Sequence, residues 1–257
     1  MSFDPVFVGL LVAAFGAGFV DAVAGGGGLI QVPALFTAFP GESPATLFGT
    51  NKGSSIFGTA NAAWRYARRI AIPWEVALPA AAAAFVFSFF GAATVAWLPR
   101  DVVRPLILVL LVAVAVYTAV HRDFGAVAGR PPARPCAAAL VVGALLGFYD
   151  GFFGPGTGSF LIFAFVRWFG LDFLRSSAAA KIVNGSTNAA ALLYFAPNGH
   201  VLWMLALAMA VFNVAGAQVG ARIAIRRGSG FVRGVFLLVT LLLIVKFGHD
   251  TFSTMVK

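Results

Sequence analysis

The sequence is poor in charge. Only 11% of its 257 residues are Asp, Glu, Lys or Arg, whereas 60% are hydrophobic, and the mean hydropathy is +0.92. Soluble domains carry roughly 25% charged residues. The chain therefore lacks the polar residues needed to cover a surface that faces water. The composition excludes an ordinary soluble domain and predicts an all-α integral membrane protein that crosses the bilayer several times.

Cysteine and histidine are also scarce. The single Cys136 excludes an internal disulfide and any multi-cysteine metal site. His121, His200 and His249 lie at the ends of apolar segments and form no pair. The spacings of Ser-His-Asp and His-Glu-x-x-His enzymes are absent as well. We therefore expect no metal, no cofactor and no enzymatic activity.

Acidic residues number 9 against 18 basic ones, which gives a net charge of +9. The basic residues gather in short segments between apolar runs, at 65–69, 121–135 and 222–233. This pattern is typical of cytoplasmic loops that obey the positive-inside rule. A nucleic-acid site or a lipid-headgroup site is the alternative; we expect contact with membrane lipid and none with nucleic acid. The N-terminus has no positively charged n-region, so we expect no cleaved signal peptide.

The two halves of the chain resemble each other. A shift of 129 residues places Asp21 on Asp150 and Lys52 on Lys181 without a gap, together with several glycines and phenylalanines. Chance does not readily align charged residues in a chain with so few of them. We therefore interpret the chain as a tandem duplication within one membrane domain, with a first repeat at 1–129 and a second at 130–257.

Each repeat divides into five apolar segments. The expected ranges are 5–22, 29–39, 45–64, 74–98 and 102–120, then 136–152, 159–170, 173–196, 201–225 and 231–247. Roughly 20 helical residues span the hydrocarbon core, so the second segment of each repeat is too short to cross it. Glycine-rich stretches, "DAVAGGGGLIQVP" from Asp21 and "DGFFGPGTGS" from Asp150, interrupt the first two segments of each repeat.

Charge indicates how the interrupted segments lie. Suppose that the first two segments of each repeat leave the membrane on the side where they entered it, and that the N-terminus is outside. The basic residues left outside are then only Arg100, Arg104, Lys246 and Lys257. Twelve arginines then lie inside: Arg65, Arg68, Arg69, Arg122, Arg130, Arg134, Arg167, Arg175, Arg222, Arg226, Arg227 and Arg233. If the first two segments of each repeat together cross the membrane once, Arg167, Arg175 and the segment 222–233 move outside, and the excess of arginine on the inside vanishes. The positive-inside rule therefore predicts two inverted repeats with both termini in the periplasm.

Matching glycine-interrupted segments in inverted repeats are typical of the binding site of a secondary transporter. We expect the backbone at Gly26, Gly27, Gly156 and Thr157 to contribute to such a site. A nucleotide-binding loop is excluded, because neither stretch has the required Lys-Ser/Thr. A glycine packing face is a poor explanation, since four consecutive glycines do not share one helix face.

The third segment of each repeat carries a lysine at matching depth. Lys52 is the eighth residue after Pro44, and Lys181 is the eighth after Phe173, with Ser43 and Asp172 expected as N-caps. A lysine about 12 Å into an apolar helix is a functional candidate; snorkelling or pairing with a structural carboxylate is the alternative.

Small polar side chains surround both lysines and share helix faces: Asn51, Ser54 and Ser55 near Lys52, and Asn184, Thr187 and Asn188 near Lys181. Interhelical hydrogen bonding could explain them, but as a cluster they favour a polar cavity that binds a small oxyanion between the two ammonium groups. Asp21 and Asp150 either cap the short helices, pair with the lysines or carry protons.

The paired motifs "GFVDAVAGGGGLIQVPAL" and "GFYDGFFGPGTGSFL", with the lysine segments "TNKGSSIFGTANA" and "AAKIVNGSTNAA", resemble those of the sulfite exporter TauE/SafE family of bacterial membrane transporters. The resemblance covers nearly the whole chain. It implies export of sulfite, sulfoacetate or a related sulfur anion across the bacterial inner membrane. An anion channel and a non-transport membrane assembly protein are the alternatives, and self-association into a homo-oligomer stays open.

Overall fold

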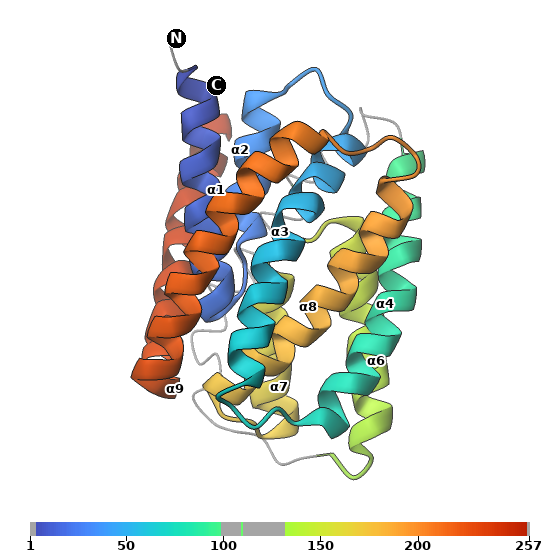
Figure 1. Ribbon diagram of the computed structural model, residues 1–257, viewed down its shortest axis with the longest axis vertical. Helices are drawn as coiled ribbons and strands as arrows, with labels where there is room; N and C mark the ends of the chain where they lie inside the picture. Colours follow the sequence, from blue (N-terminus) through green and yellow to red (C-terminus); the bar gives the residue numbers. More distant parts are fainter. Residues whose placement is uncertain (1–3, 99–108, 110–131, 256–257) are drawn as a thin grey trace.

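The computed structural model describes residues 4–98, 109 and 132–255, and every regular element in these residues is an α-helix (Figure 1). The helices are α1 (Pro5–Ala24), α2 (Gly28–Ala38), α3 (Pro44–Ala67), α4 (Trp74–Trp97), α6 (Pro135–Phe152), α7 (Thr157–Phe169), α8 (Phe173–Phe195) and α9 (Trp203–Met255). Non-helical dihedral angles at Gly228, φ 74° and ψ −170°, divide α9 into two helices. The expected segments match these helices closely, and the segment expected at 231–247 lies in α9 beyond Gly228. The segment expected at 102–120 lies outside the described residues.

The predicted N-caps at the third segments are confirmed. Ser43 Oγ accepts a hydrogen bond from the Thr46 backbone amide at 3.0 Å. Asp172 Oδ1 accepts from the backbone amides of Leu174 and Arg175, both at 2.9 Å. These bonds satisfy amides that have no partner within the helix, and so they define where α3 and α8 begin.

Glycines with positive φ end the first helix of each pair. Gly25 (φ 74°) and Gly26 (φ 93°) separate α1 from α2, and Gly154 (φ 91°) and Gly156 (φ 88°) separate α6 from α7. Residues with a side chain rarely adopt this conformation, which explains the glycine content of both breaks. The suggestion that Asp21 and Asp150 cap the short helices is wrong, because glycines stand at both N-cap positions and no side chain caps either helix.

The two broken segments are hairpins that approach from opposite ends of the molecule. In Figure 1, α1 descends from the upper end and α2 returns to it, whereas α6 rises from the lower end and α7 returns there. The central helices α3 and α8 pack against each other, while α4 packs on α6 and α1 packs on α9. Glycines permit the last two contacts, since a Cβ at Gly18 would lie 2.1 Å from the Asn213 carbonyl oxygen and one at Gly147 2.4 Å from Ala84 Cα.

Within the described residues, four helices are long and apolar enough to cross a membrane: Pro5–Ala24, Trp74–Trp97, Pro135–Phe152 and Trp203–Val232. The central α3 and α8 have 24 and 23 residues, but they carry buried polar side chains that include both lysines. Large apolar side chains such as Phe90 and Trp97 are exposed on the outer α4. Apolar helices therefore surround a polar centre, as in a multi-pass membrane protein.

Candidate functional site

The two glycine breaks meet backbone to backbone. A Cβ at Gly25 would lie 2.3 Å from the carbonyl carbon of Gly158, and a Cβ at Gly158 would lie 2.7 Å from Gly25 Cα. Ser159 Oγ also donates a hydrogen bond to the Ala24 carbonyl at 3.1 Å. Non-helical backbone at this depth needs protein or water around it, and each break supplies part of the surroundings of the other.

Two buried ion pairs lie beside the breaks. Lys52 Nζ is 2.5 Å from Asp150 Oδ2, and Lys181 Nζ is 2.9 Å from Asp21 Oδ2. Each lysine is therefore paired with the aspartate of the other half of the chain. Of the alternatives considered for Asp21 and Asp150, the geometry shows charge pairing. Neither ammonium group is an uncompensated charge, because a carboxylate of opposite sign lies against each one.

The pairs differ in access to solvent. The side chains of Lys52 and Asp150 are 4% and 6% exposed, whereas Lys181 is 0% and Asp21 is 21% exposed. Thr59 Oγ1 also lies 3.5 Å from Asp21 Oδ2, within reach of a weak hydrogen bond. Both side chains of the Lys52–Asp150 pair are thus almost fully buried, while the Asp21 carboxylate of the Lys181–Asp21 pair is accessible to water or to a ligand.

A cavity of about 30 Å³ lies where the breaks and the ion pairs meet. This volume accommodates about two water molecules. Nine residues expected at the site line it: Asp21, Gly26, Gly27, Asn51, Lys52, Ser55, Asp150, Asn184 and Asn188. The structure therefore brings together polar side chains from α1, α3, α6 and α8 with the backbone at the start of α2.

Five other expected residues do not line this cavity. Thr187 Oγ1 donates to the Asn184 carbonyl at 3.0 Å, and Thr157 Oγ1 donates to the Gly154 carbonyl at 2.8 Å. Gly156 is the left-handed residue at the start of α7, and Ser54 is buried within α3. Lys181 reaches the cavity only through its partner Asp21.

Sequence reasoning missed Thr59 and Asn213, which also line the cavity. Thr59 is four residues after Ser55 and so continues the polar face of α3; extending that face by one turn would have found it. Asn213 donates to the Ala14 carbonyl and to Gln31 Oε1, both at 3.2 Å. Its signal in the sequence is an amide within the apolar run that begins at residue 201 and that holds Gln218 five residues later.

Two of the lining amides have unused hydrogen-bonding capacity. Among the described residues, the Oδ1 atoms of Asn51 and Asn184 are buried and have no hydrogen-bond partner. A buried polar atom without a partner costs about 1–3 kcal/mol. The assignment of amide O and N can be exchanged by rotation of the side chain, so these amides can offer either acceptors or N–H donors to a molecule in the cavity.

Apolar helices around a charged, glycine-lined centre define a multi-pass membrane protein with a buried polar site. The chain belongs to the TauE/SafE family, since the family model described as "Sulfite exporter TauE/SafE" matches residues 10–247. The resemblance found in the sequence motifs is thereby confirmed.

Relatives from several bacteria carry transporter names. The chain is 37% identical to the probable membrane transporter protein ORF9 of Sinorhizobium sp., over 94% of this chain and 92% of the relative. It is 34% identical to the probable membrane transporter protein YfcA of Escherichia coli K12, over 96% and 92% of the two chains. A probable membrane transporter protein of Haemophilus influenzae is 30% identical over 94% of each chain. No solved structure significantly matches this chain. The family and these relatives indicate a membrane transporter.

Proposed function

We propose that this protein is a secondary transporter that exports a small sulfur-containing anion, sulfite or an organosulfonate such as sulfoacetate, across the bacterial inner membrane. The observation that carries the proposal is the central cavity, where two glycine breaks, two ion pairs and several amides meet. Gly26 and Gly27, which line this cavity, stand at the start of α2, where the helix dipole favours negative charge. Gly156 and Thr157 stand at the matching start of α7 but do not line the cavity.

The proposed architecture is two inverted repeats, 1–129 and 130–257. Three pairs of helices begin 129 residues apart: α2 and α7 at Gly28 and Thr157, α3 and α8 at Pro44 and Phe173, and α4 and α9 at Trp74 and Trp203. The hairpins enter from opposite ends, and the exchange of ion-pair partners is what a two-fold relation between the halves would produce.

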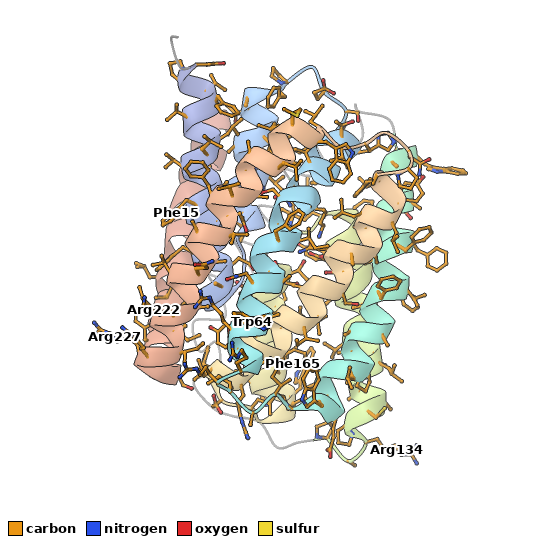
Figure 2. The ribbon with its side chains drawn as sticks, viewed as in Figure 1. Phe15, Trp64, Arg134, Phe165, Arg222 and Arg227 are labelled. Carbon is orange, nitrogen blue, oxygen red and sulfur yellow. The ribbon has the colours of Figure 1, made fainter. Side chains whose placement is uncertain are left out.

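The proposed orientation has both termini in the periplasm. Figure 1 places both chain ends at the upper end of the molecule, and Figure 2 shows Arg134, Arg222 and Arg227 toward the lower end. Arginines concentrate on the cytoplasmic side of membrane proteins. This arrangement supports a cytoplasmic lower end in a cell inner membrane.

A substrate anion enters a site in which an aspartate already neutralises the charge of each lysine. An entering anion can take the place of an aspartate beside a lysine, and a displaced aspartate that gains a proton is no longer a buried unpaired charge. Asp21 and Asp150 are accordingly our candidates for proton coupling, with Lys52 and Lys181 as anion ligands. The cavity of about 30 Å³ is too small for an organosulfonate as it stands, so transport requires the hairpins or the central helices to move.

The driving force is electrical or chemical rather than ATP hydrolysis in this proposal. With the cytoplasm negative, export of an anion is downhill by about 2.3 kcal/mol per charge for each 100 mV. Coupling to protons would change this value by the charge that the protons carry.

The test is flux in proteoliposomes with a panel of sulfite, sulfate, thiosulfate, sulfoacetate and taurine. We expect saturable uptake of one sulfur anion and counterflow when the same anion is loaded inside, with loss of both in Lys52→Met. Arg175→Gln, exposed at the start of α8, is the matched control and should transport normally. Flux without saturation or counterflow would indicate an anion channel. No flux of any panel member would favour a non-transport assembly protein and would contradict the proposal.

A further inference from the structure

A second cavity, of about 460 Å³, lies between α3 and α9. We call it the arginine pocket; its lining residues are Trp64, Arg65, Arg68, Arg69, Arg222, Ile225 and Arg226. Figure 2 shows Trp64 and Arg222 in the lower half of the molecule, on two helices that pack against each other. The arginine pocket is separate from the central cavity, with which it shares no lining residue.

The five arginines of this pocket have no acidic partner in the part of the chain that the structure describes, where both ion pairs belong to the central site. Two of the arginines are held in place by their own helix. Arg65 Nε donates to Asn61 Oδ1 at 3.2 Å, and the Arg68 guanidinium lies 4.9 Å from the centre of the Trp64 ring. The positive-inside rule explains why arginines gather at this end. It does not explain why residues 65–69 and 222–226, far apart in sequence, line one hollow.

The arginine pocket lies about one hydrocarbon-core thickness along α3 and α9 from the starts of these helices. Arg65 is 21 residues after Pro44 (65 − 44), and Arg222 is 19 residues after Trp203 (222 − 203). At about 1.5 Å per residue, these positions are about 31 and 28 Å from helix starts that lie at the same upper end in Figure 1. The hydrocarbon core is about 30 Å thick. Trp64, which is 55% exposed, has the amphipathic ring that membrane proteins place at this interface.

We propose that the arginine pocket binds the phosphate group of an anionic phospholipid in the leaflet at this end of the molecule. Guanidinium groups form paired hydrogen bonds to phosphate oxygens, and basic pockets between transmembrane helices suit lipids with phosphate headgroups. Trp64 and Ile225 provide apolar surface for the glycerol and the first carbons of the acyl chains. The bound lipid joins α3, which carries Lys52, to α9, which carries Asn213. This site does not depend on which molecule the protein transports.

The experiment compares lipid binding in two triple variants. Arg69→Gln/Arg222→Gln/Arg226→Gln removes three charges from the arginine pocket. Arg134→Gln/Arg175→Gln/Arg227→Gln removes three exposed charges outside it. Native mass spectrometry with cardiolipin, phosphatidylglycerol and phosphatidylcholine should show that wild type and the control triple prefer the anionic lipids, while the pocket triple loses at least tenfold in affinity for them. Equal losses in both triples would mean dispersed surface charge and would overturn the proposal.

Two further arms keep the test decisive. The first is the lysine triple, Arg69→Lys/Arg222→Lys/Arg226→Lys, which retains the charge but not the forked donor geometry of arginine. We expect it to bind the anionic lipids more weakly than wild type. It provides a readout if the glutamine triple fails to fold. Unchanged affinity in the lysine triple would contradict the proposal. Inorganic phosphate and sulfite serve as soluble probes, measured by the thermal unfolding midpoint. If either stabilises the protein through these arginines while the lipids show no preference, the pocket is a soluble-anion site and the lipid assignment is wrong.

Discussion

The side chains of Lys52 and Asp150 are almost completely enclosed by the protein, whereas Asp21 keeps part of its surface exposed beside the enclosed Lys181. Removing one partner of a buried pair costs about 3–5 kcal/mol, because the other charge is left without compensation. The cost is smaller where water can reach the remaining group. The difference in exposure therefore predicts unequal effects for chemically identical substitutions at the two lysines.

We expect Lys52→Met, which leaves Asp150 enclosed, to lower the free energy of unfolding by about 3–5 kcal/mol. Lys181→Met should cost less, because Asp21 stays hydrated. Asp21→Asn should cost more than Lys181→Met, since it leaves the fully buried Lys181 alone. Denaturant unfolding in detergent measures all three. Equal losses for the two lysine variants would contradict this reasoning.

Removal of a complete pair separates structural from functional roles. In Lys52→Met/Asp150→Leu no unpaired charge remains, and apolar replacements of a buried pair are often close to neutral in stability. We expect the double variant to be more stable than Lys52→Met and yet inactive in the proteoliposome flux assay. Wild-type flux in a stable double variant would show that this pair is only structural.

The ion pairs also show what could not be read from the residues. The sequence indicated that Lys52, Lys181, Asp21 and Asp150 belong to one polar centre, because they recur at a fixed offset in a chain with little charge. It did not indicate which aspartate faces which lysine. That choice depends on how the two halves pack, and the distance along the chain carries no information about it.

At the scale of helices, the contact between the breaks predicts sharp differences among glycines. Gly25→Ala would place a methyl group 2.3 Å from the Gly158 backbone at a φ of 74°, so we expect loss of folded protein. Gly16→Ala, within the preceding helix α1, meets nothing within 4 Å and should be neutral or stabilising by about 0.5–1 kcal/mol. The yield of folded protein after detergent extraction provides the comparison, and equal yields with similar thermal unfolding midpoints would mean that the breaks do not depend on this contact.

The prediction for Gly26 and Gly156 depends on dihedral angles. Their φ values of 93° and 88° resist a β-branched residue. At Gly26 the nearest atoms, Leu29 Cδ1 and Ser159 Oγ at 3.2 Å, belong to side chains that can shift. We expect Gly26→Val and Gly156→Val to reach the membrane, as judged by immunoblot, and to lack flux. Normal flux in both variants would count against a role for these tips in transport.

Helices were the most predictable level of the structure. Apolar runs, the caps at Ser43 and Asp172, and the glycine stretches indicated most helix ends to within a few residues, because each is a local property of the chain. The lining of the cavity was less predictable. Ser54 and Ser55 are adjacent in sequence, but only Ser55 lines the cavity, since the rotation of α3 about its axis is determined by contacts with α8 and α9.

For the whole molecule, the proposed orientation gives a labelling pattern. In a Cys136→Ala background, Asn198→Cys, in the exposed connection between α8 and α9, should react with an impermeant maleimide in intact cells. Gly230→Cys, exposed just beyond the break at Gly228, should react only after permeabilisation. Reaction of both sites from the same side would rule out the proposed inverted arrangement.

The exchange of partners between Lys52–Asp150 and Lys181–Asp21 has a consequence for biosynthesis. The ribosome makes Lys52 98 residues before Asp150, and it makes Asp21 160 residues before Lys181. During that interval the nascent first half holds an ammonium group and a carboxylate that have not met their final partners. We therefore expect this half to stay hydrated or sheltered by the insertion machinery until the second half arrives. A chain that stops after the first half would lack these partners permanently and would be a natural target for membrane proteases.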